Sequence, residues 1–199
     1  MKKIAISLML LGLTGCSAGM INQSKKMLGL KLYQDSQAEH TSNIRIEHNN
    51  IFSVTLYPNG CITSLQPKFQ MLPEVNSAGS LKNQLLSKPI EYKQKLLNMP
   101  FPPEENRSYS EFKLPANRLL AIGASKGYYN GVEYRGCGVN AIYKFSENKN
   151  YELLDNTSQC SLQINEIRNN GERVELKPLK YLNNVNEWAG CDAQIKDLQ

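Results

Sequence analysis

The sequence predicts a mainly β protein, an antiparallel β-sandwich with one or two short helices inserted before the C-terminal strands. From Tyr109 onward, segments of strand-forming residues recur about every eight to twelve positions, a spacing typical of sandwiches. Residues 139–145 and 173–178 alternate apolar and polar side chains, so that one face of each would be buried. An even number of cysteines beyond the N-terminal region fits a fold held by disulfides.

The N-terminus has the pattern of an export signal. Lys2 and Lys3 precede an apolar run from Ile4 to Leu13, which is ten residues long. A membrane-spanning helix needs about 20 apolar residues, so this run is too short to span a bilayer. Residues 1–15 are therefore predicted to be a signal peptide.

The tetrapeptide Leu13-Thr14-Gly15-Cys16 follows this run directly. It resembles the lipobox of bacterial lipoproteins. The resemblance implies that the Cys16 thiol receives a diacylglycerol, that the signal is cut before Cys16, and that the new amine receives an acyl chain such as palmitate. Ser17 stands where lipoproteins retained in the inner membrane carry Asp, which implies the outer membrane. Two or three acyl chains would hold the protein at the bilayer surface.

The mature chain is predicted to have a tether at residues 16–42 and a single domain at residues 43–199, with a helical insertion at about 79–98. Its length suits one domain with a sizeable core. Removal of Lys2 and Lys3 lowers the formal net charge from +5 to +3. This charge is small and scattered, so no nucleic-acid partner is predicted.

The first strands are predicted over Asn43–Thr63. Ile44 and Ile46 alternate with polar residues, and Phe52, Val54 and Leu56 do the same further along. This pattern predicts a half-buried antiparallel hairpin turning at His48-Asn49-Asn50. Pro58-Asn59-Gly60 is predicted to end the hairpin as a turn.

The middle of the chain differs in pattern. Two short helices are predicted between Leu65 and Asn98, because leucines follow Ser80 at near-helical spacing and Pro89 is tolerated near a helix start. Met99–Asn106 holds three prolines and is predicted to be an extended surface connector. Six further strands are predicted, at Tyr109–Leu114, Arg118–Ser125, Val139–Phe145, Tyr151–Asp155, Ser161–Ile167 and Glu172–Leu179.

Four cysteines remain besides the lipidated one, and in an oxidising compartment they predict two disulfides. Four cysteines allow three pairings, and the sequence alone does not choose among them. If the strands on either side of residues 146–150 form a hairpin, Cys137 and Cys160 would lie opposite each other. This register favours Cys137 with Cys160 and leaves Cys61 for Cys191.

The histidines and cysteines do not form a metal-binding pattern. His40 and His48 lie in polar surroundings without a second ligand nearby, and the cysteines contain no CxxC pair. Solvated histidines and disulfides are favoured over a zinc site. No metal and no cofactor is predicted.

The chain also lacks a recognisable catalytic motif. Ser125 comes nearest to a nucleophile elbow, but no helix follows it. Glu104-Glu105 lies in the proline-rich connector, where nothing indicates burial that would raise a pKa. Gly136-Cys137-Gly138 lacks the third glycine and the helix of a phosphate-binding loop. No catalytic residue is predicted, and the chain is expected not to be an enzyme.

One segment has the composition of a contact surface. Three tyrosines and an arginine lie on a glycine-rich stretch, and these residue types are enriched in binding hot spots. The candidate protein-binding residues are Tyr128, Tyr129, Tyr134 and Arg135. The alternative is that the tyrosines cover the edge of the sandwich in an ordinary hairpin.

The second half of the chain combines Leu114-Pro115-Ala116 before a strand, Cys137, Phe145 and Tyr151 flanking a turn, and Cys160. In these features it is similar to small lipoproteins with an immunoglobulin-like or transthyretin-like sandwich. The resemblance implies the fold and the cell envelope as location, and it transfers no catalytic residue. Some sandwiches of this kind dock secretion machinery at the outer membrane.

Together these features predict a non-enzymatic lipoprotein anchored through Cys16 in the bacterial outer membrane, with its domain in the periplasm. It would act as a protein-binding or structural module, with the lipid bilayer and an envelope protein as partners. Three alternatives remain: an envelope hydrolase with an unrecognised site, a docking subunit of a secretion apparatus, and an inhibitor-like module.

Overall fold

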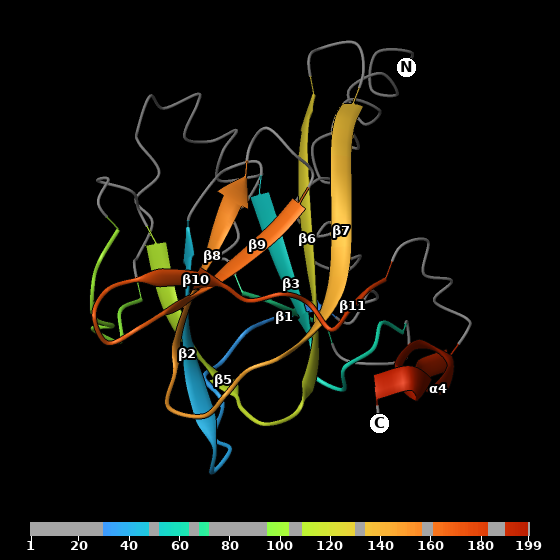
Figure 1. Cartoon of the computed structure of the whole chain (residues 1–199). Helices are drawn as coiled ribbons and strands as arrows, with labels where there is room; N and C mark the ends of the chain where they lie inside the picture. Colours follow the sequence, from blue (N-terminus) through green and yellow to red (C-terminus); the bar gives the residue numbers. More distant parts are fainter. Residues whose placement is uncertain are drawn as a thin grey trace, which may run out of the picture. The chain divides into compact units, whose positions relative to one another are not determined.

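The computed structural model describes residues 30–47, 52–63, 68–71, 95–103, 109–129, 134–156, 161–182 and 190–198. The chain divides into two compact units, and the unit described below comprises Lys31–Glu74 and Tyr92–Gln199. Its described residues form two β-sheets and a short C-terminal helical segment (Figure 1). The prediction of a mainly β sandwich is confirmed.

The larger sheet has six strands in the order β1-β4-β3-β6-β7-β11. From β4 to β11 each neighbouring pair is antiparallel. The strands are β1 (Leu30–Leu32), β4 (Lys68–Gln70), β3 (Phe52–Tyr57), β6 (Leu119–Tyr129), β7 (Tyr134–Lys144) and β11 (Lys180–Tyr181). The pairing of β6 with β7 runs without a break from Leu119 opposite Lys144 to Tyr129 opposite Tyr134.

The smaller sheet has five strands in the order β10-β9-β8-β2-β5. The strands are β10 (Arg173–Glu175), β9 (Ser161–Ile167), β8 (Asn150–Asn156), β2 (Thr41–Glu47) and β5 (Tyr109–Pro115). Strand β2 pairs antiparallel with β5 and parallel with β8, and the other pairs are antiparallel.

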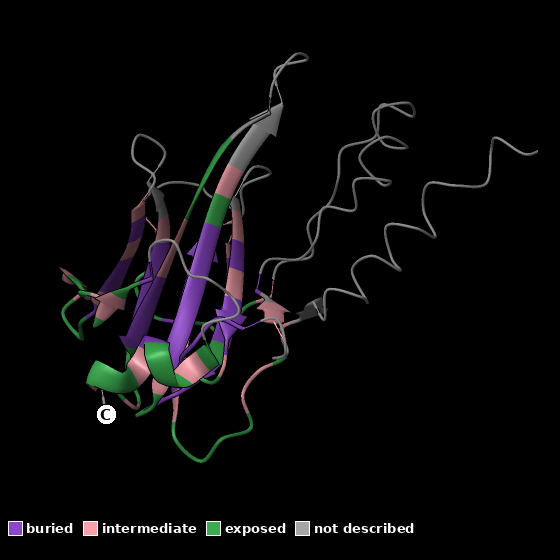
Figure 2. Ribbon diagram, turned by 90° about the vertical axis from the view of Figure 1, so that its right-hand side faces the viewer, coloured by how far each residue is buried: buried purple, intermediate pink, exposed green. Residues whose placement is uncertain are grey.

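One hydrophobic core contains residues of both sheets, which therefore pack face to face. The larger sheet contributes Val54, Leu56, Leu120, Ile122, Ala141 and Tyr143, and the smaller sheet contributes Ile44, Ile46, Phe112, Leu114, Tyr151, Leu153, Leu162 and Ile164. Figure 2 shows that buried residues, in purple, are concentrated along the strands. The alternation in the sequence predicts these inward faces correctly, because successive side chains of a strand point to opposite sides.

The predicted hairpin over Asn43–Thr63 is wrong, although its strand segments and the turn at Pro58-Asn59-Gly60 are present. Strand β2 lies in the smaller sheet and β3 in the larger one, so they belong to opposite layers. Alternation shows which face of a strand is buried, but it does not show which strand lies beside it. The turn residues expected at 48–50 lie outside the described residues.

The hairpin assumed around residues 146–150 is also wrong. Strand β7 pairs with β6, and β8 pairs with β2 and β9, so the chain crosses from one sheet to the other at this turn. Cys137 lies opposite Lys126 of β6. Cys137 is disulfide-bonded, but Cys160 lies outside the described residues, and their pairing stays a prediction.

Three segment boundaries differ from the predictions. Residues 30–42, expected in the tether, include β1 and the start of β2, because Ser42 is already a buried residue of the smaller sheet. The two helices predicted between Leu65 and Asn98 are absent from the described parts of that range, because Lys68–Gln70 forms β4 and residues 95–98 are not helical. Residues 72–94, with most of the insertion predicted at about 79–98, lie outside the described residues. The strand expected over Glu172–Leu179 is limited to β10.

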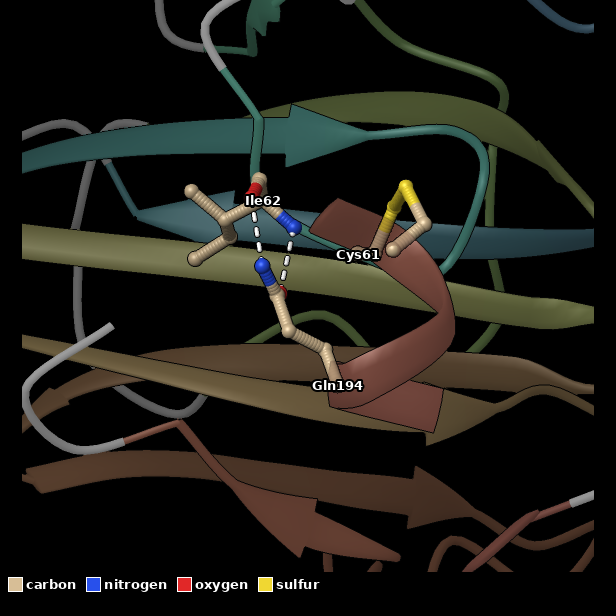
Figure 3. The surroundings of a disulfide bond; sticks show 4 residues. Cys61, Ile62 and Gln194 are labelled. Carbon is tan, nitrogen blue, oxygen red and sulfur yellow. Dashed lines mark hydrogen bonds between the residues drawn. A yellow bond between two sulfur atoms is a disulfide. The ribbon is translucent and has the colours of Figure 1, made fainter. Parts of the chain in front are cut away.

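The C-terminal segment is helical, which was not predicted from the sequence. It consists of α4 (Gly190–Ile195) and the 3-10 helix η2 (Lys196–Leu198). Cys191 of α4 forms the disulfide with Cys61, which confirms that predicted pairing. Beside it, Gln194 donates to the carbonyl of Ile62 at 2.6 Å and accepts from the Ile62 N–H at 2.8 Å (Figure 3). The disulfide and the amide pair therefore fix α4 to the segment that follows β3.

The turn between β3 and Cys61 needs a glycine. Gly60 has a φ of 73°, in the left-handed region that disfavours other residues. A Cβ at this position would lie 2.7 Å from the Leu119 Cβ. Gly60 thus lets the chain turn close to β6 and places Cys61 where α4 can reach it.

Alkaline pH is expected to destabilise the fold. Burial raises the pKa of Tyr33, Tyr143 and Tyr151, so these phenols stay neutral in the folded chain above the usual pKa of about 10. Between the unfolded and the folded pKa values the folded state binds more protons, so its stability is present below pH 10 and falls as the pH rises further. The free energy of unfolding should drop by up to about 1.4 kcal/mol per pH unit for each such tyrosine.

Urea unfolding between pH 9 and pH 11 would check this expectation. Tyr143→Phe provides the control, because it removes one buried phenol and should make the decline with pH less steep. An equal slope in both proteins would show that Tyr143 does not contribute.

Candidate protein-binding site

Three charged side chains lie together on the outer face of the smaller sheet. Arg45 of β2 is opposite Glu111 of β5 on one side and Glu152 of β8 on the other. Their neighbours along the strands, such as Ile44, face the core. The alternation that buries the isoleucines therefore places these three charges side by side on the other face of the sheet.

The three charged side chains are buried, and Arg45 contacts both glutamates. Arg45 is only 1% exposed. Its Nε and Nη2 donate to Oε1 of Glu111 at 3.1 and 3.0 Å, and its Nη1 is 3.5 Å from Oε1 of Glu152. The guanidinium also lies 4.9 Å from the ring centre of Tyr109. Such burial requires paired charges, because an unpaired buried ion is costly.

Residues 95–103, here called the strap, are bound to this cluster. Arg45 donates to three consecutive strap carbonyls, those of Met99 at 3.2 Å, Pro100 at 3.3 Å and Phe101 at 2.8 Å. One carboxylate oxygen of Glu111 accepts from the strap N–H groups of Leu97 and Met99, at 2.7 and 3.1 Å. The buried charges thus satisfy the backbone of a segment that belongs to no sheet.

A second arginine holds the far end of the strap. Arg173 of β10 donates to Oε2 of Glu152 at 2.8 Å, and its Nη2 reaches the carbonyls of Phe101 and Pro102 at 3.3 and 3.4 Å. Two arginines and two glutamates from four strands therefore hold the strap in one conformation.

The strap has an unusual backbone and presents apolar side chains. Asn98 and Phe101 have φ values of 58° and 53°, in the left-handed region that bulky residues rarely adopt. Leu96 is 47% exposed and Phe101 is 39% exposed, whereas Met99 is buried. A Cβ at Gly171 would lie 3.0 Å from the Phe101 ring, so the glycine leaves room for that ring. Strain of this kind persists only where the surrounding contacts impose it.

These contacts determine what the site can do. Arg45, Glu111 and Glu152 are each bonded to another part of the protein, and the described geometry shows no catalytic pairing among them. The cluster fixes the shape of the strap, on which the side chains of Leu96 and Phe101 are exposed. This arrangement suits protein recognition, in which rigid apolar anchors bind with little loss of entropy.

The sequence-predicted binding residues lie elsewhere. Tyr128 and Tyr129 end β6, Tyr134 and Arg135 begin β7, and the register places Tyr128 opposite Arg135. Their backbones form the last described pairs of the antiparallel ladder between β6 and β7, next to the hairpin tip at residues 130–133, which lies outside the described residues. The described backbone thus places the four residues near each other, and their role in binding stays a prediction.

The other singled-out residues are dispersed. His40 Nδ1 lies 2.9 Å from Oε2 of Glu147, with both side chains solvent-accessible, and His48 lies outside the described residues. Ser125 is in the middle of β6, opposite Gly138 of β7. Cys16 and Glu104-Glu105 also lie outside the described residues. In the described ranges no group of three His, Cys, Asp or Glu side chains could hold a metal ion.

Comparison of the chain with protein-family models, with curated proteins and with solved structures finds no match. In the described part of the chain, no helix is long and apolar enough to cross a membrane.

Proposed function

We propose that this chain is a non-enzymatic lipoprotein of the bacterial outer membrane that binds another envelope protein through the strap. The anchor in this proposal rests on the lipobox at Leu13-Thr14-Gly15-Cys16 and on Ser17. The binding role rests on one observation: a strained, apolar surface segment is held rigidly by a buried charge cluster.

The strap has the properties of a preformed recognition segment. Its exposed Phe101 is flanked by Pro100 and Pro102, which restrict the backbone before any partner binds. Arg45 and Arg173 both donate to the Phe101 carbonyl, so the residue that presents the ring is held most firmly. A segment ordered in advance loses little conformational entropy on binding.

Crosslinking in intact cells tests this proposal. Wild-type protein should capture a specific envelope protein, and Phe101→Ala should reduce that capture at least tenfold, because an aromatic anchor would be removed. Leu179→Ala is the matched control, since Leu179 is 49% exposed but bonds through its backbone to β7 of the larger sheet. This control should capture the partner as well as wild type does.

Two further variants separate the parts of the proposal. Combined replacement of Tyr128, Tyr129 and Arg135 by alanine should leave capture intact, and loss in this variant alone would move the binding site to the hairpin tip. Cys16→Ala should abolish acyl labelling and membrane fractionation. Unchanged fractionation would contradict the anchor, and no captured protein with wild type would contradict the binding role.

A further inference from the structure

Strand β7 is covered unequally along its two edges. On one edge it pairs with β6 over its whole length, from Tyr134 to Lys144. On the other edge β11 lies opposite only Ala141 and Ile142. In the part of the chain that the structure describes, no other strand lies along this second edge.

The hydrogen bonds of β11 show which backbone groups point to this edge. The N–H of Leu179 donates to the carbonyl of Ile142 at 2.8 Å, and that of Leu182 donates to the carbonyl of Asn140 at 2.7 Å. Backbone groups alternate in direction along a strand, and the register with β6 contains no bulge. The backbone groups of Gly138, Gly136 and Tyr134 therefore point the same way, away from β6.

The next outward-pointing residues offer unusually open backbone. Gly136 and Gly138 are both exposed and have no side chain that could screen their N–H and C=O groups. Natural proteins usually protect a sheet edge with lysine, proline or a bulge. Between Tyr134 and Gly138 there is no proline and no bulge, and the one charged residue, Arg135, is an alternate residue whose backbone groups point toward β6. In the described part of the chain this edge is therefore open to another strand.

We infer that this edge of β7 pairs with the same edge of a second copy of the chain, in an antiparallel and twofold-symmetric arrangement. In the register that fits, Gly136 lies opposite Gly136 of the second copy, and Tyr134 lies opposite its Gly138. This ladder uses outward groups that pair with no described strand, and it stops before Asn140, whose carbonyl already accepts from Leu182.

The second copy is favoured because the available segment is self-complementary. In a twofold antiparallel pair, each outward residue lies opposite an outward residue of the same strand in the other copy. Tyr134, Gly136 and Gly138 meet this condition, because Gly136 pairs with itself and Tyr134 pairs with Gly138. The three carry no charge, so the symmetric pairing places no like charges opposite each other. The interface is isologous and closed, which ends assembly at the dimer.

Sedimentation of the full mature chain in detergent tests the pairing. Wild type should show a concentration-dependent dimer. Gly138→Pro should raise its dissociation constant at least tenfold, because proline removes an outward N–H and places a ring in the path of the second strand. The ladder between β6 and β7 is made by the alternate residues, such as Val139, so this substitution should leave the monomer folded.

Gly138→Ala is the matched control. A Cβ at Gly138 would meet its nearest atoms at 3.7 and 3.8 Å, which is ordinary contact, and alanine keeps the N–H. Its dissociation constant should stay within about twofold of the wild-type value. A wild type that is monomeric at every concentration, or a folded Gly138→Pro variant that dimerises equally well, would overturn the inference.

Hydrogen exchange of the wild-type protein provides a readout that needs no variant. Amide protons of Gly136 and Gly138 should exchange more slowly as the dimer forms, whereas that of Cys137, which points toward β6, should not change. Equal exchange of the two glycine amides at low and high protein concentration would contradict the pairing, even if Gly138→Pro failed to fold.

Discussion

Replacing Arg45 with alanine is expected to lower the free energy of unfolding by about 3–5 kcal/mol. The change leaves the buried carboxylate of Glu111 without its arginine partner, and it leaves that of Glu152 with Arg173 alone. It also removes the hydrogen bonds to three strap carbonyls, so the strap should lose its fixed conformation. Urea unfolding measures the global effect, and hydrogen exchange at the Leu97 and Met99 amides measures the local one.

Arg168→Ala is the matched control for this prediction. Arg168 forms an ion pair with Glu172 at 2.9 Å, but both side chains are about half exposed. Exposed pairs contribute little, so this variant should change stability by less than about 1 kcal/mol. If Arg45→Ala were as mild as Arg168→Ala, with unchanged protection of the strap amides, the cluster would not be what holds the strap.

Removing the disulfide with Cys61→Ser and Cys191→Ser combined is expected to cost about 5 kcal/mol in the chain-entropy model. The two cysteines are 130 residues apart, so their link restricts most of the unfolded domain. The unlinked denatured state should be more expanded, which would raise the denaturant m-value as well as lowering the midpoint. Urea unfolding reports both quantities in one experiment.

Asp197→Ala tests whether such an effect belongs to the disulfide or to the helical segment in general. Asp197 pairs with Lys180 at 3.2 Å and is largely exposed, so its loss should have little effect. An unchanged midpoint and m-value in the double serine variant would show that Gln194 and the packing of Ile195 and Leu198 suffice to hold the segment.

The positions of the strands were predicted from the sequence better than the pairing between strands. Alternation located the strands around Ile44 and Val139, because it follows from the direction of successive side chains. Strand pairing depends on which inward faces meet in the core. Strands that follow each other in the sequence, such as β2 and β3, lie in opposite sheets here. The pairing of Cys61 with Cys191 was nevertheless predicted, although the hairpin register used to reach it is wrong.

The strap was the main omission. Arg45 occupies a polar position of an alternating strand, which in sequence is indistinguishable from a solvent-facing position. The three prolines correctly indicated an extended segment outside the sheets, but not that the buried Arg45 and the partly exposed Arg173 bind its carbonyls. One signal was present in the sequence: Phe101, a large apolar residue, stands between prolines in a segment predicted to face solvent.

The central place of β2 in its sheet has a consequence for the order of folding. Arg45 meets Glu111 66 positions further along the chain and Glu152 107 positions further along. Both neighbours of β2 are thus synthesised long after β2 itself, and long loops must close before either pairing forms. Contacts this distant in sequence are typical of domains that fold in milliseconds to seconds. A chain interrupted before β8 would leave β2 at the edge of an incomplete sheet, with Arg45 lacking one of its two carboxylates.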